Sequence, residues 1–551
     1  MSSTLNKHVT RCRTVLVIAV LVALAAAAAP AAASGSGERS VSDYTGLTSA
    51  QQGVLRGIAS DSWKFYADDI DPSTNLPMDN LTYAGGAARP TSYGRYTSAA
   101  NIGVYLWAVV SARDLGLISR SQAVQRLRAT LAGVSRLAKD RGFLHQWYDT
   151  TTGQVIKNPG DTTACPSLSR TFDNCSFISN VDNGWYASGL IVARQAVPDI
   201  APWASSLLSR MDFGAFYDAR AETHCNVNQA IPGAQPTGQM FGGYYVGMPP
   251  DVGTNWQHYY HNGALYSDPR ISAYIGMGLR QMPGNVWWRS WRELPPPAPY
   301  PDCQTSDPNF SWQGQWPMVG SWKTQTDPQS GQNFPVWEGH YTYPGSDLTF
   351  IPTFAGGMFE ALMVNAVVPE TSWGTRSFGR ADVRAVQVQA KYASEQLHYP
   401  VWGMSPSSTA DDSGGYGGFG VDGLTFPYYG LGATADNPNL GLSQCHGCAT
   451  EDVVTPHASF IALDAAPQLA FDNIQALRRH YSGVYGSAGF FDAVNPTTGA
   501  VGHRILVLDQ SMIMAALDNA LQNRAMQRHF AADPVSWAAK TYLGAEQMSL
   551  P

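Results

Sequence analysis

The 551-residue chain has little charge of either sign. Asp, Glu, Lys and Arg make up 14% of it, and the formal net charge at pH 7 is −7. There is no basic run and no basic patch, so the feature that attracts a phosphate backbone is missing. We therefore expect no nucleic-acid partner. Beyond its first 33 residues the chain also lacks any apolar run long enough to cross a bilayer, which takes ~20 residues.

The single long apolar run lies near the N terminus, between residues 15 and 29. Lys7, Arg11 and Arg13 precede it, and Pro30 and small residues follow it. This order is typical of a secretory signal. A membrane anchor is the alternative, but Pro30 and the Ser-Gly run after it leave the segment short for a span. We expect a signal peptide at 1–33, a disordered lead at 34–45, and a secreted protein that leaves the membrane on cleavage.

Cysteine is scarce, with seven residues in all, and Cys12 lies in the predicted signal. An even number of cysteines outside the cell indicates disulfides. Sequence proximity favours Cys165–Cys175 and Cys445–Cys448, and elimination leaves Cys225–Cys303, although six cysteines allow 15 pairings. No second CxxC accompanies Cys445 and Cys448, and no His pair has the H-E-x-x-H spacing. We expect no metal and no cofactor.

Aromatic residues are plentiful at 11%, with 16 Trp and 26 Tyr against 20 Phe. Trp and Tyr combine an apolar ring with a polar edge, which suits a wet cleft. The apolar faces of sugar rings stack on such side chains. A large aromatic core is the alternative interpretation, but the excess of Trp and Tyr favours a carbohydrate site.

Helical spacing recurs along the chain, whereas strand-like alternation is scarce. The segments are Ala100–Leu115, Ser119–Lys139, Gly184–Val197, Pro202–Met211, Ser272–Leu279, Met358–Val368, Ala381–Leu397, Pro456–Ala465, Asn473–Tyr485 and Gln510–Gln522. Many similar helices joined by long loops suit an all-α fold, an (α/α)6 toroid whose helix pairs surround a cleft. Since no linker divides the chain, we expect a single domain at 46–551.

Residues 212–350 are too long and irregular for an ordinary loop, because loops above ~12–15 residues carry function or structure of their own. We interpret them as disulfide-bearing insertions that form the rim of the cleft. Their aromatic residues are candidates for substrate contact, with packing against the toroid as the alternative. The candidates are Trp256, Tyr259, Tyr260 and Tyr266, together with His261.

Several short segments occur in a fixed order along the chain. They are Thr97–Leu106, Ala112–Gly116, Gly142–Phe143, Trp147–Asp149, Ser179–Gly184, Ala264–Ile271, Gly356–Met363, Trp402–Ser405, Tyr416–Gly420, Val454–Ala458, Gly489–Asn495 and Leu508–Gln510. Together they resemble the glycoamylase-like family of (α/α)6 proteins, which includes endo-β-1,2-glucanases and is similar to a domain of cyclic β-1,2-glucan synthases. The resemblance runs from about Thr97 to about Asn523.

The resemblance implies carboxylate catalysis and adds Asp182, Trp147, Trp402 and Asp492 as site residues. Two departures put a β-1,2-glucan substrate in doubt. Asp268 stands where the family pattern has Glu, and Ser405 begins a Ser-rich stretch where relatives carry an acidic residue.

Glycoside hydrolysis needs one protonated and one ionised carboxyl group. Glu360 lies among apolar neighbours, where desolvation raises a pKa and favours a general acid; a structural Glu paired with Arg is the alternative. Asp268 precedes a predicted helix, so it is either an ionised partner with a lowered pKa or a helix cap. Asp182 is the third candidate, and it too could be a cap.

The sequence thus predicts a secreted glycoside hydrolase acting on a glucan or related polysaccharide. A catalytically silent carbohydrate-binding toroid and a transglycosylase with the same residues are the rivals, and a polysaccharide lyase is a weaker one. Linkage, stereochemistry, endo or exo action and oligomeric state stay open.

Overall fold

The computed structural model describes residues 44–219, 238–248, 262, 264–290, 292, 319–343, 345–351, 353, 356–420 and 452–551, with the backbone of 224–225 and 229–230. The predicted signal peptide and most of the predicted lead, Trp256, Tyr259, Tyr260 and His261, and Cys303, Cys445 and Cys448 lie outside these residues. Of the described helices, none is both long and apolar enough to span a membrane.

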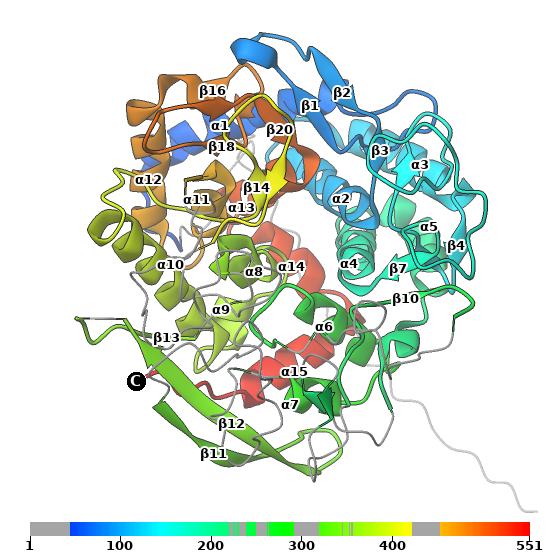
Figure 1. Ribbon diagram of the computed structural model, residues 1–551, viewed down its shortest axis with the longest axis vertical. Helices are drawn as coiled ribbons and strands as arrows, with labels where there is room; N and C mark the ends of the chain where they lie inside the picture. The colour runs from blue at the N-terminus through cyan, green and yellow to red at the C-terminus, as the bar shows by residue number, and fades with distance from the viewer. Residues whose placement is uncertain are drawn as a thin grey trace, which may run out of the picture. The chain divides into compact units, whose positions relative to one another are not determined.

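Six of the described helices pack in ring order around the middle of the molecule (Figure 1), each contacting the next and the last returning to the first. They are α2 (Ala99–Asp114), α4 (Asn180–Ala196), α6 (Arg270–Gly278), α8 (Met358–Leu362), α11 (Pro456–Ile461) and α13 (Val507–Leu521). Helices α2 and α13 are buried on nearly every side, as expected of helices that are apolar all round.

The helices outside this ring bury one face each, as their amphipathic spacing predicts. They include α1 (Ser49–Asp68), α3 (Arg120–Arg136), α5 (Ala201–Leu208), α10 (Phe378–Glu395) and α12 (Pro467–His480). Shorter ones are α7 (Asn285–Arg289), α9 (Glu370–Trp373), α14 (Ala525–Ala531) and α15 (Trp537–Ala545). Outer and inner helices largely alternate along the chain, which places each outer helix beside the ring.

Helices α2 and α4 approach unusually closely. A Cβ on Gly103 would lie 2.3 Å from the Trp185 carbonyl oxygen, and one on Gly189 would lie 2.3 Å from that of Gly103. Only glycine fits at either position. This crossing fixes the relative position of two helices that both contribute to the cavity described below.

Strands are short, with one exception that the sequence did not reveal. Within the predicted insertion, β11 (Val319–Thr326) and β12 (Asn333–Thr342) pair antiparallel, and β13 (Thr349–Phe350) adds a third strand. Smaller ladders join β2 (Ser92–Gly94), β1 (Asn80–Thr82) and β20 (Arg504–Leu506), and β10 (Gly243–Tyr245) with β7 (Phe177–Ser179). The all-α prediction therefore describes the ring but not this insertion.

The disulfide Cys165–Cys175 is present, with its Cα atoms 5.6 Å apart, as sequence proximity predicted. It closes a short loop between β6 (Tyr148–Asp149) and β7. The pairings of Cys225 with Cys303 and of Cys445 with Cys448 remain predictions, because these partners lie outside the described residues.

Candidate functional site

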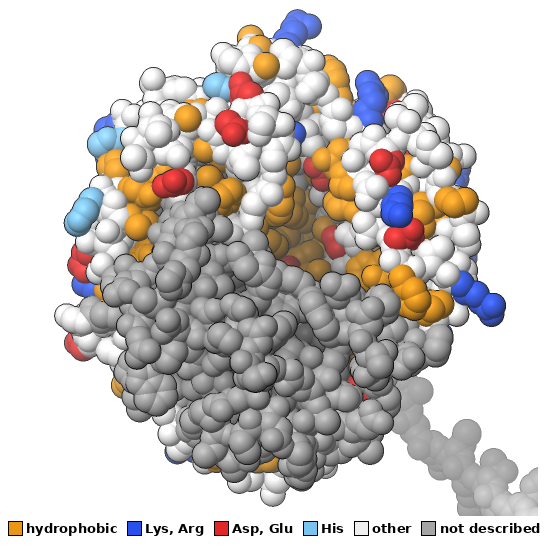
Figure 2. All heavy atoms as spheres, in the orientation of Figure 1, with side chains coloured by type: hydrophobic (Ala, Val, Ile, Leu, Met, Phe, Trp, Pro, Cys, Tyr) orange, Lys and Arg blue, Asp and Glu red, His pale blue; other side chains and the backbone are white. Residues whose placement is uncertain are grey.

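A cavity of about 460 Å³ lies where the N-terminal ends of the ring helices meet. Its walls come from the starts of α2, α4, α8 and α13 and from Asp268, two residues before α6. Helix N-termini carry partial positive charge, so carboxylates are favoured beside them. Figure 2 shows this face hollowed at its centre, with hydrophobic side chains in the hollow and acidic side chains beside it. The lining includes Asp79, Tyr96, Asn101, Trp147, Asp182, Trp185, Asp268, Phe359, Tyr416 and Arg504.

Asp268 and Glu360 form a pair of neighbouring carboxyl groups, although 92 positions separate them. The Ser267 hydroxyl donates to Glu360 Oε2 (2.7 Å), and the backbone N–H of Asp268 donates to the same oxygen (3.3 Å). The indole N–H of Trp185 donates to Asp268 Oδ2 (3.1 Å). Asp268 is the member of the pair that lines the cavity.

The surroundings of Asp268 change its pKa in a direction that the sequence did not predict. Burial raises the pKa of Asp268 well above its usual range, and the charge of Glu360 raises it further, while the hydrogen bond from Trp185 lowers it. This direction is opposite to the lowered pKa that the sequence predicted for Asp268. The helix-cap interpretation is also wrong, because α6 begins at Arg270, its N-cap is Pro269, and no side-chain cap bond is made there.

Asp268 and Glu360 are the two carboxyl groups that the sequence predicted as the acid and its partner. Hydrolysis requires ~5–5.5 Å between them for retention or ~6.5–9.5 Å for inversion. Here the charge of Glu360 acts on Asp268 at close range, since Glu360 Oε2 accepts from the Asp268 backbone N–H. Asp182 is a further carboxyl group that lines the same cavity.

Asp182 supplies a carboxylate on another wall of the cavity. It lies in the first turn of α4, where Ser179, not Asp182, is the cap: the Ser179 hydroxyl accepts from the Asp182 N–H (3.3 Å). The Gln146 amide donates to Asp182 Oδ2 (3.3 Å). Burial raises the pKa of Asp182, and the hydrogen bonds with Ser179 and Gln146 lower it. The cap alternative therefore fails, and the carboxylate is free to face the cavity.

Aromatic rings line the cavity next to these acids. Trp147 stands edge-on to Tyr96, with ring centroids 5.7 Å apart. Trp185 packs edge-on against the buried Trp107, at 5.4 Å. Trp147 therefore lies in the cavity as predicted, and Trp185 combines a place in the wall with its hydrogen bond to Asp268.

Sequence reasoning missed Asp79, which also lines the cavity. Its Oδ1 accepts from the Asn101 amide (2.8 Å) and its Oδ2 from the Asn80 amide (2.9 Å). Asn101 lies in a segment that carried the family resemblance, but nothing in the local pattern around Asp79 marked it. Tyr416 and Arg504 were likewise missed as lining residues, although Tyr416 begins one of the segments noted above.

Arg270 ties α6 to α8 beneath the acid pair. Its guanidinium donates to the backbone carbonyls of Glu360 (3.1 Å) and Ala361 (2.6 Å), and in a bidentate ion pair to Glu370 (2.8 and 2.7 Å). The Tyr274 hydroxyl donates to Glu370 as well (2.9 Å). This fully buried network sets the position of Glu360 relative to Asp268.

A second group of buried side chains supports α8 from the other side. The Ser405 hydroxyl accepts from the backbone N–H of Phe359 (3.0 Å), next to Glu360, where α8 has no side-chain cap of its own. His457 Nε2 lies 2.9 Å from the same hydroxyl. His457 Nδ1 is 2.8 Å from Thr455 Oγ1 and 3.0 Å from Asp509 Oδ2. Burial lowers the pKa of His457 to about 4, so the imidazole is neutral.

Within the described ranges, His457, Asp492 and Asp509 are the three residues whose ligand atoms could surround a metal ion, all within 4.8 Å of one another. Hydrogen bonds engage two of the three residues, since both His457 nitrogens have partners and Asp492 Oδ2 accepts from the Ser408 N–H (2.6 Å), whereas the Asp509 oxygens accept no hydrogen bond within the described ranges. Burial raises the pKa of Asp492 well above its usual range, and that of Asp509 to about 7.

Three predicted substrate residues do not line the cavity. Tyr266 is 1% exposed and donates its hydroxyl to Asp382 (2.9 Å), so packing is its role. Trp402 is 6% exposed, with its backbone bonded to the Asn473 side chain. Asp492 is 4% exposed and lies in the buried group just described. Apolar burial and aromatic content do not distinguish a core position from a cleft position, which explains these errors.

Comparison with known proteins places two family matches on the chain. Residues 328–534 match the family model Glycoamylase, and residues 57–217 match a family of unknown function, DUF3131. A stretch of 97 residues is 38% identical to the cyclic β-(1,2)-glucan synthase NdvB of Rhizobium meliloti. That stretch is 17% of this chain and only 3% of the synthase.

Solved structures share the fold over most of the chain. An endo-β-1,2-glucanase of Chitinophaga pinensis, in complex with sophorotriose and glucose, aligns with 90% of this chain and 98% of its own at a TM-score of 0.58 and 14% identity. A β-1,2-glucanase of Parabacteroides distasonis aligns with 91% of this chain and 60% of its own, at a TM-score of 0.60 and 15% identity. An endo-β-1,2-glucanase of Talaromyces funiculosus, in complex with sophorose, aligns with 90% of this chain and 91% of its own, at a TM-score of 0.54 and 11% identity.

At these identities the structural matches establish the fold alone. With the Glycoamylase model and the synthase stretch, they confirm that the chain resembles the glycoamylase-like family.

Proposed function

We propose that this chain is a glycoside hydrolase acting on a glucan within the central cavity. The observation that carries the proposal is the convergence of Asp268, with its raised pKa beside Glu360, and Asp182 on one aromatic-lined cavity. The six-helix ring with its outer helices supports the (α/α)6 toroid predicted from the sequence as the scaffold. The substrate class follows the glucanases that share this fold.

In this proposal Asp268 is the general acid. Its raised pKa favours the protonated form that an acid needs, and its side chain lines the cavity. As the bond between the anomeric carbon and the glycosidic oxygen breaks, that proton passes to the leaving oxygen. Glu360 acts through Asp268, because its negative charge keeps the acid protonated until substrate arrives.

Asp182 is the partner carboxylate in this proposal. Either it removes a proton from a water molecule that attacks the anomeric carbon, or it attacks that carbon itself and water later cleaves the ester. The Gln146 amide holds the carboxylate in place in both cases. Asp79 is the next candidate, because it lines the same cavity and is held by two amide donors.

Purified protein incubated with a panel of glucans tests the proposal, with β-1,2-glucan first and β-1,3-, β-1,4- and α-1,4-glucans beside it. New reducing ends from one glucan, lost in Asp268→Asn, are the expected result. Anomer analysis of the first products by NMR would distinguish retention from inversion. Binding of a glucan without cleavage would instead identify a silent carbohydrate-binding protein.

Transglycosylation is the second candidate, and the synthase stretch favours it. A transglycosylase uses the same acid but passes the sugar to a hydroxyl group instead of water. Oligosaccharides longer than the substrate, or cyclic products, without a matching rise in reducing ends would favour it over hydrolysis.

We also propose that the chain is secreted after removal of residues 1–33. The basic-apolar-small order at the N terminus supports this. N-terminal sequencing of the protein from culture medium should find a start near Ser34. An intact N terminus on a membrane-bound product would contradict it.

A further inference from the structure

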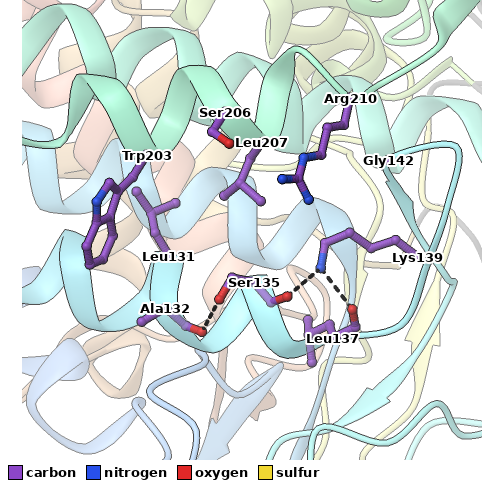
Figure 3. A pocket seen from close by; sticks show the side chains of 10 residues that line it. All are labelled: Leu131, Ala132, Ser135, Leu137, Lys139, Gly142, Trp203, Ser206, Leu207 and Arg210. Atoms are coloured by element: carbon purple, nitrogen blue, oxygen red, sulfur yellow. Dashed lines mark hydrogen bonds between the residues drawn. The ribbon is translucent and has the colours of Figure 1, made fainter.

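A second pocket lies on the outside of the ring, between α3 and α5, and has a volume of about 490 Å³. It shares no lining residue with the central cavity. Such a volume falls in the range of ~300–1,000 Å³ typical of small-molecule sites. Figure 3 shows the groove with Trp203 at one end and Arg210 and Lys139 at the other.

The two ends of this pocket differ in chemistry. At one end the Trp203 ring is 48% exposed, beside the aliphatic side chains of Leu131 and Leu207. A large aromatic ring left this open in water presents a flat apolar surface that suits the C–H face of a pyranose. The Ser206 hydroxyl at the pocket wall can hydrogen-bond to a sugar hydroxyl.

The other end has an excess of positive charge. Neither Arg210 nor Lys139 has a carboxylate at ion-pair distance within the described ranges. The nearby acids Asp140 and Asp212 pair instead with Arg141, whose guanidinium nitrogens lie 3.8 and 3.5 Å from their Oδ2 atoms. Lys139 contacts the carbonyls of Val134 and Leu137 at the end of α3, which holds its ammonium at the pocket wall. Burial and the charge of Arg210 lower the pKa of Lys139 to about 8.

The shape of this end depends on a close backbone contact. Gly142 has a φ of +81°, and a Cβ there would lie 2.3 Å from the Arg210 carbonyl oxygen. The loop that carries Gly142 therefore packs directly on the backbone of Arg210. This contact fixes the backbone position from which the Arg210 guanidinium extends. The positive charge at this end contrasts with the chain as a whole, which is acidic.

From this pairing of an exposed aromatic ring with two unneutralised cations, we propose that the α3–α5 pocket binds an acidic saccharide. The ligand class is a pyranose that carries a carboxylate or a phosphate group. The ring stacks on Trp203, and the anionic group accepts charge-assisted hydrogen bonds from Arg210. The site is separate from the central cavity, so its occupation does not depend on the proposed hydrolysis.

Ligand-observed NMR titrations on the full chain test this proposal with four probes. Glucuronate and glucose 6-phosphate carry ring and charge, glucose carries the ring alone, and sulfate carries the charge alone. We expect at least one of the two acidic sugars to bind tenfold or more tightly than glucose and sulfate. Which of them binds better identifies the anionic group.

Variants locate the binding. Trp203→Ala and Arg210→Gln should each weaken it by about tenfold or more, whereas Arg136→Gln, an exposed cation of α3 outside the pocket, and Phe172→Ala, an exposed ring elsewhere, should not. Asp268→Asn should also leave the affinity unchanged. Equal binding of sulfate with no effect of Trp203→Ala would reduce the site to an adventitious ion site. Binding that is insensitive to Arg210→Gln, or lost in Asp268→Asn, would overturn the assignment.

Discussion

Two buried acids near Arg270, Glu370 and Asp268, have opposite electrostatic surroundings. Glu370 is completely buried, and Arg270 and Tyr274 satisfy both its oxygens. Asp268, two residues before Arg270, has the acid Glu360 as its neighbour and faces the cavity. A carboxylate that only holds the fold together is paired with a cation. Asp268 has a raised pKa beside another acid and also lines the cavity, and this combination makes it the functional candidate of the two.

Removing the acid itself should have the largest effect. Asp268→Asn keeps the shape but cannot donate a proton, so we expect turnover to fall by ~10²–10⁴ with little change in melting temperature. Asp382→Asn is the matched control, because Asp382 is also buried with a raised pKa but does not line the cavity. Turnover within tenfold of the parent in Asp268→Asn would refute its role.

Breaking the structural pair should affect stability instead. Glu370→Gln leaves Arg270 charged and unpaired in the interior, which costs about 3–5 kcal/mol in the free energy of unfolding. Glu395→Gln removes an exposed partner of Lys391 and should cost less than about 0.5 kcal/mol. Chemical denaturation of both variants measures the difference. Comparable losses in the two would show that burial does not distinguish these pairs.

The positions of the ring helices could largely be predicted from the sequence, because apolar residues recur at helical spacing around each, although α8 and α11 themselves have only 5 and 6 residues. The structure of residues 212–350 could not be predicted, since the β11–β12 hairpin lies in a stretch whose sequence is irregular. The site was predicted in part. Residues in segments that resembled the family, such as Asp182, Asp268 and Glu360, do converge.

What the sequence could not supply is the relation between those residues. The apolar flank of Glu360 suggested that it holds the proton, but the raised pKa of Asp268 arises only because the fold brings it beside Glu360 across 92 positions. Asp79 follows a Pro-Met pair with no distinguishing pattern, and only the ladder of β1 with β2 and β20 brings it to the cavity.

A substitution at Glu360 tests whether its charge raises the pKa of Asp268. Glu360→Gln removes the negative charge that raises the pKa of Asp268, so that pKa should fall, by about one to three units for a charge at this range. Because the acid works only while protonated, activity should be lost at a lower pH than in the parent. At acidic pH, where Asp268 is still protonated, turnover should lie within about tenfold of the parent. A pH–rate profile of kcat/KM measures this shift, and an unchanged alkaline limb would contradict the coupling.

The smallest effect should come from the support that α8 receives from Ser405. Ser405→Ala leaves the Phe359 N–H and His457 Nε2 without their buried partner, which costs about 1–2 kcal/mol of stability. Since that N–H precedes Glu360, the variant should also lower kcat more than it raises KM. Ser407→Ala, a buried neighbour whose hydroxyl bonds only to the Ser408 carbonyl, is the matched control and should change neither. If Ser405→Ala lowers the melting temperature but leaves kcat unchanged, the hydroxyl stabilises the fold without positioning Glu360.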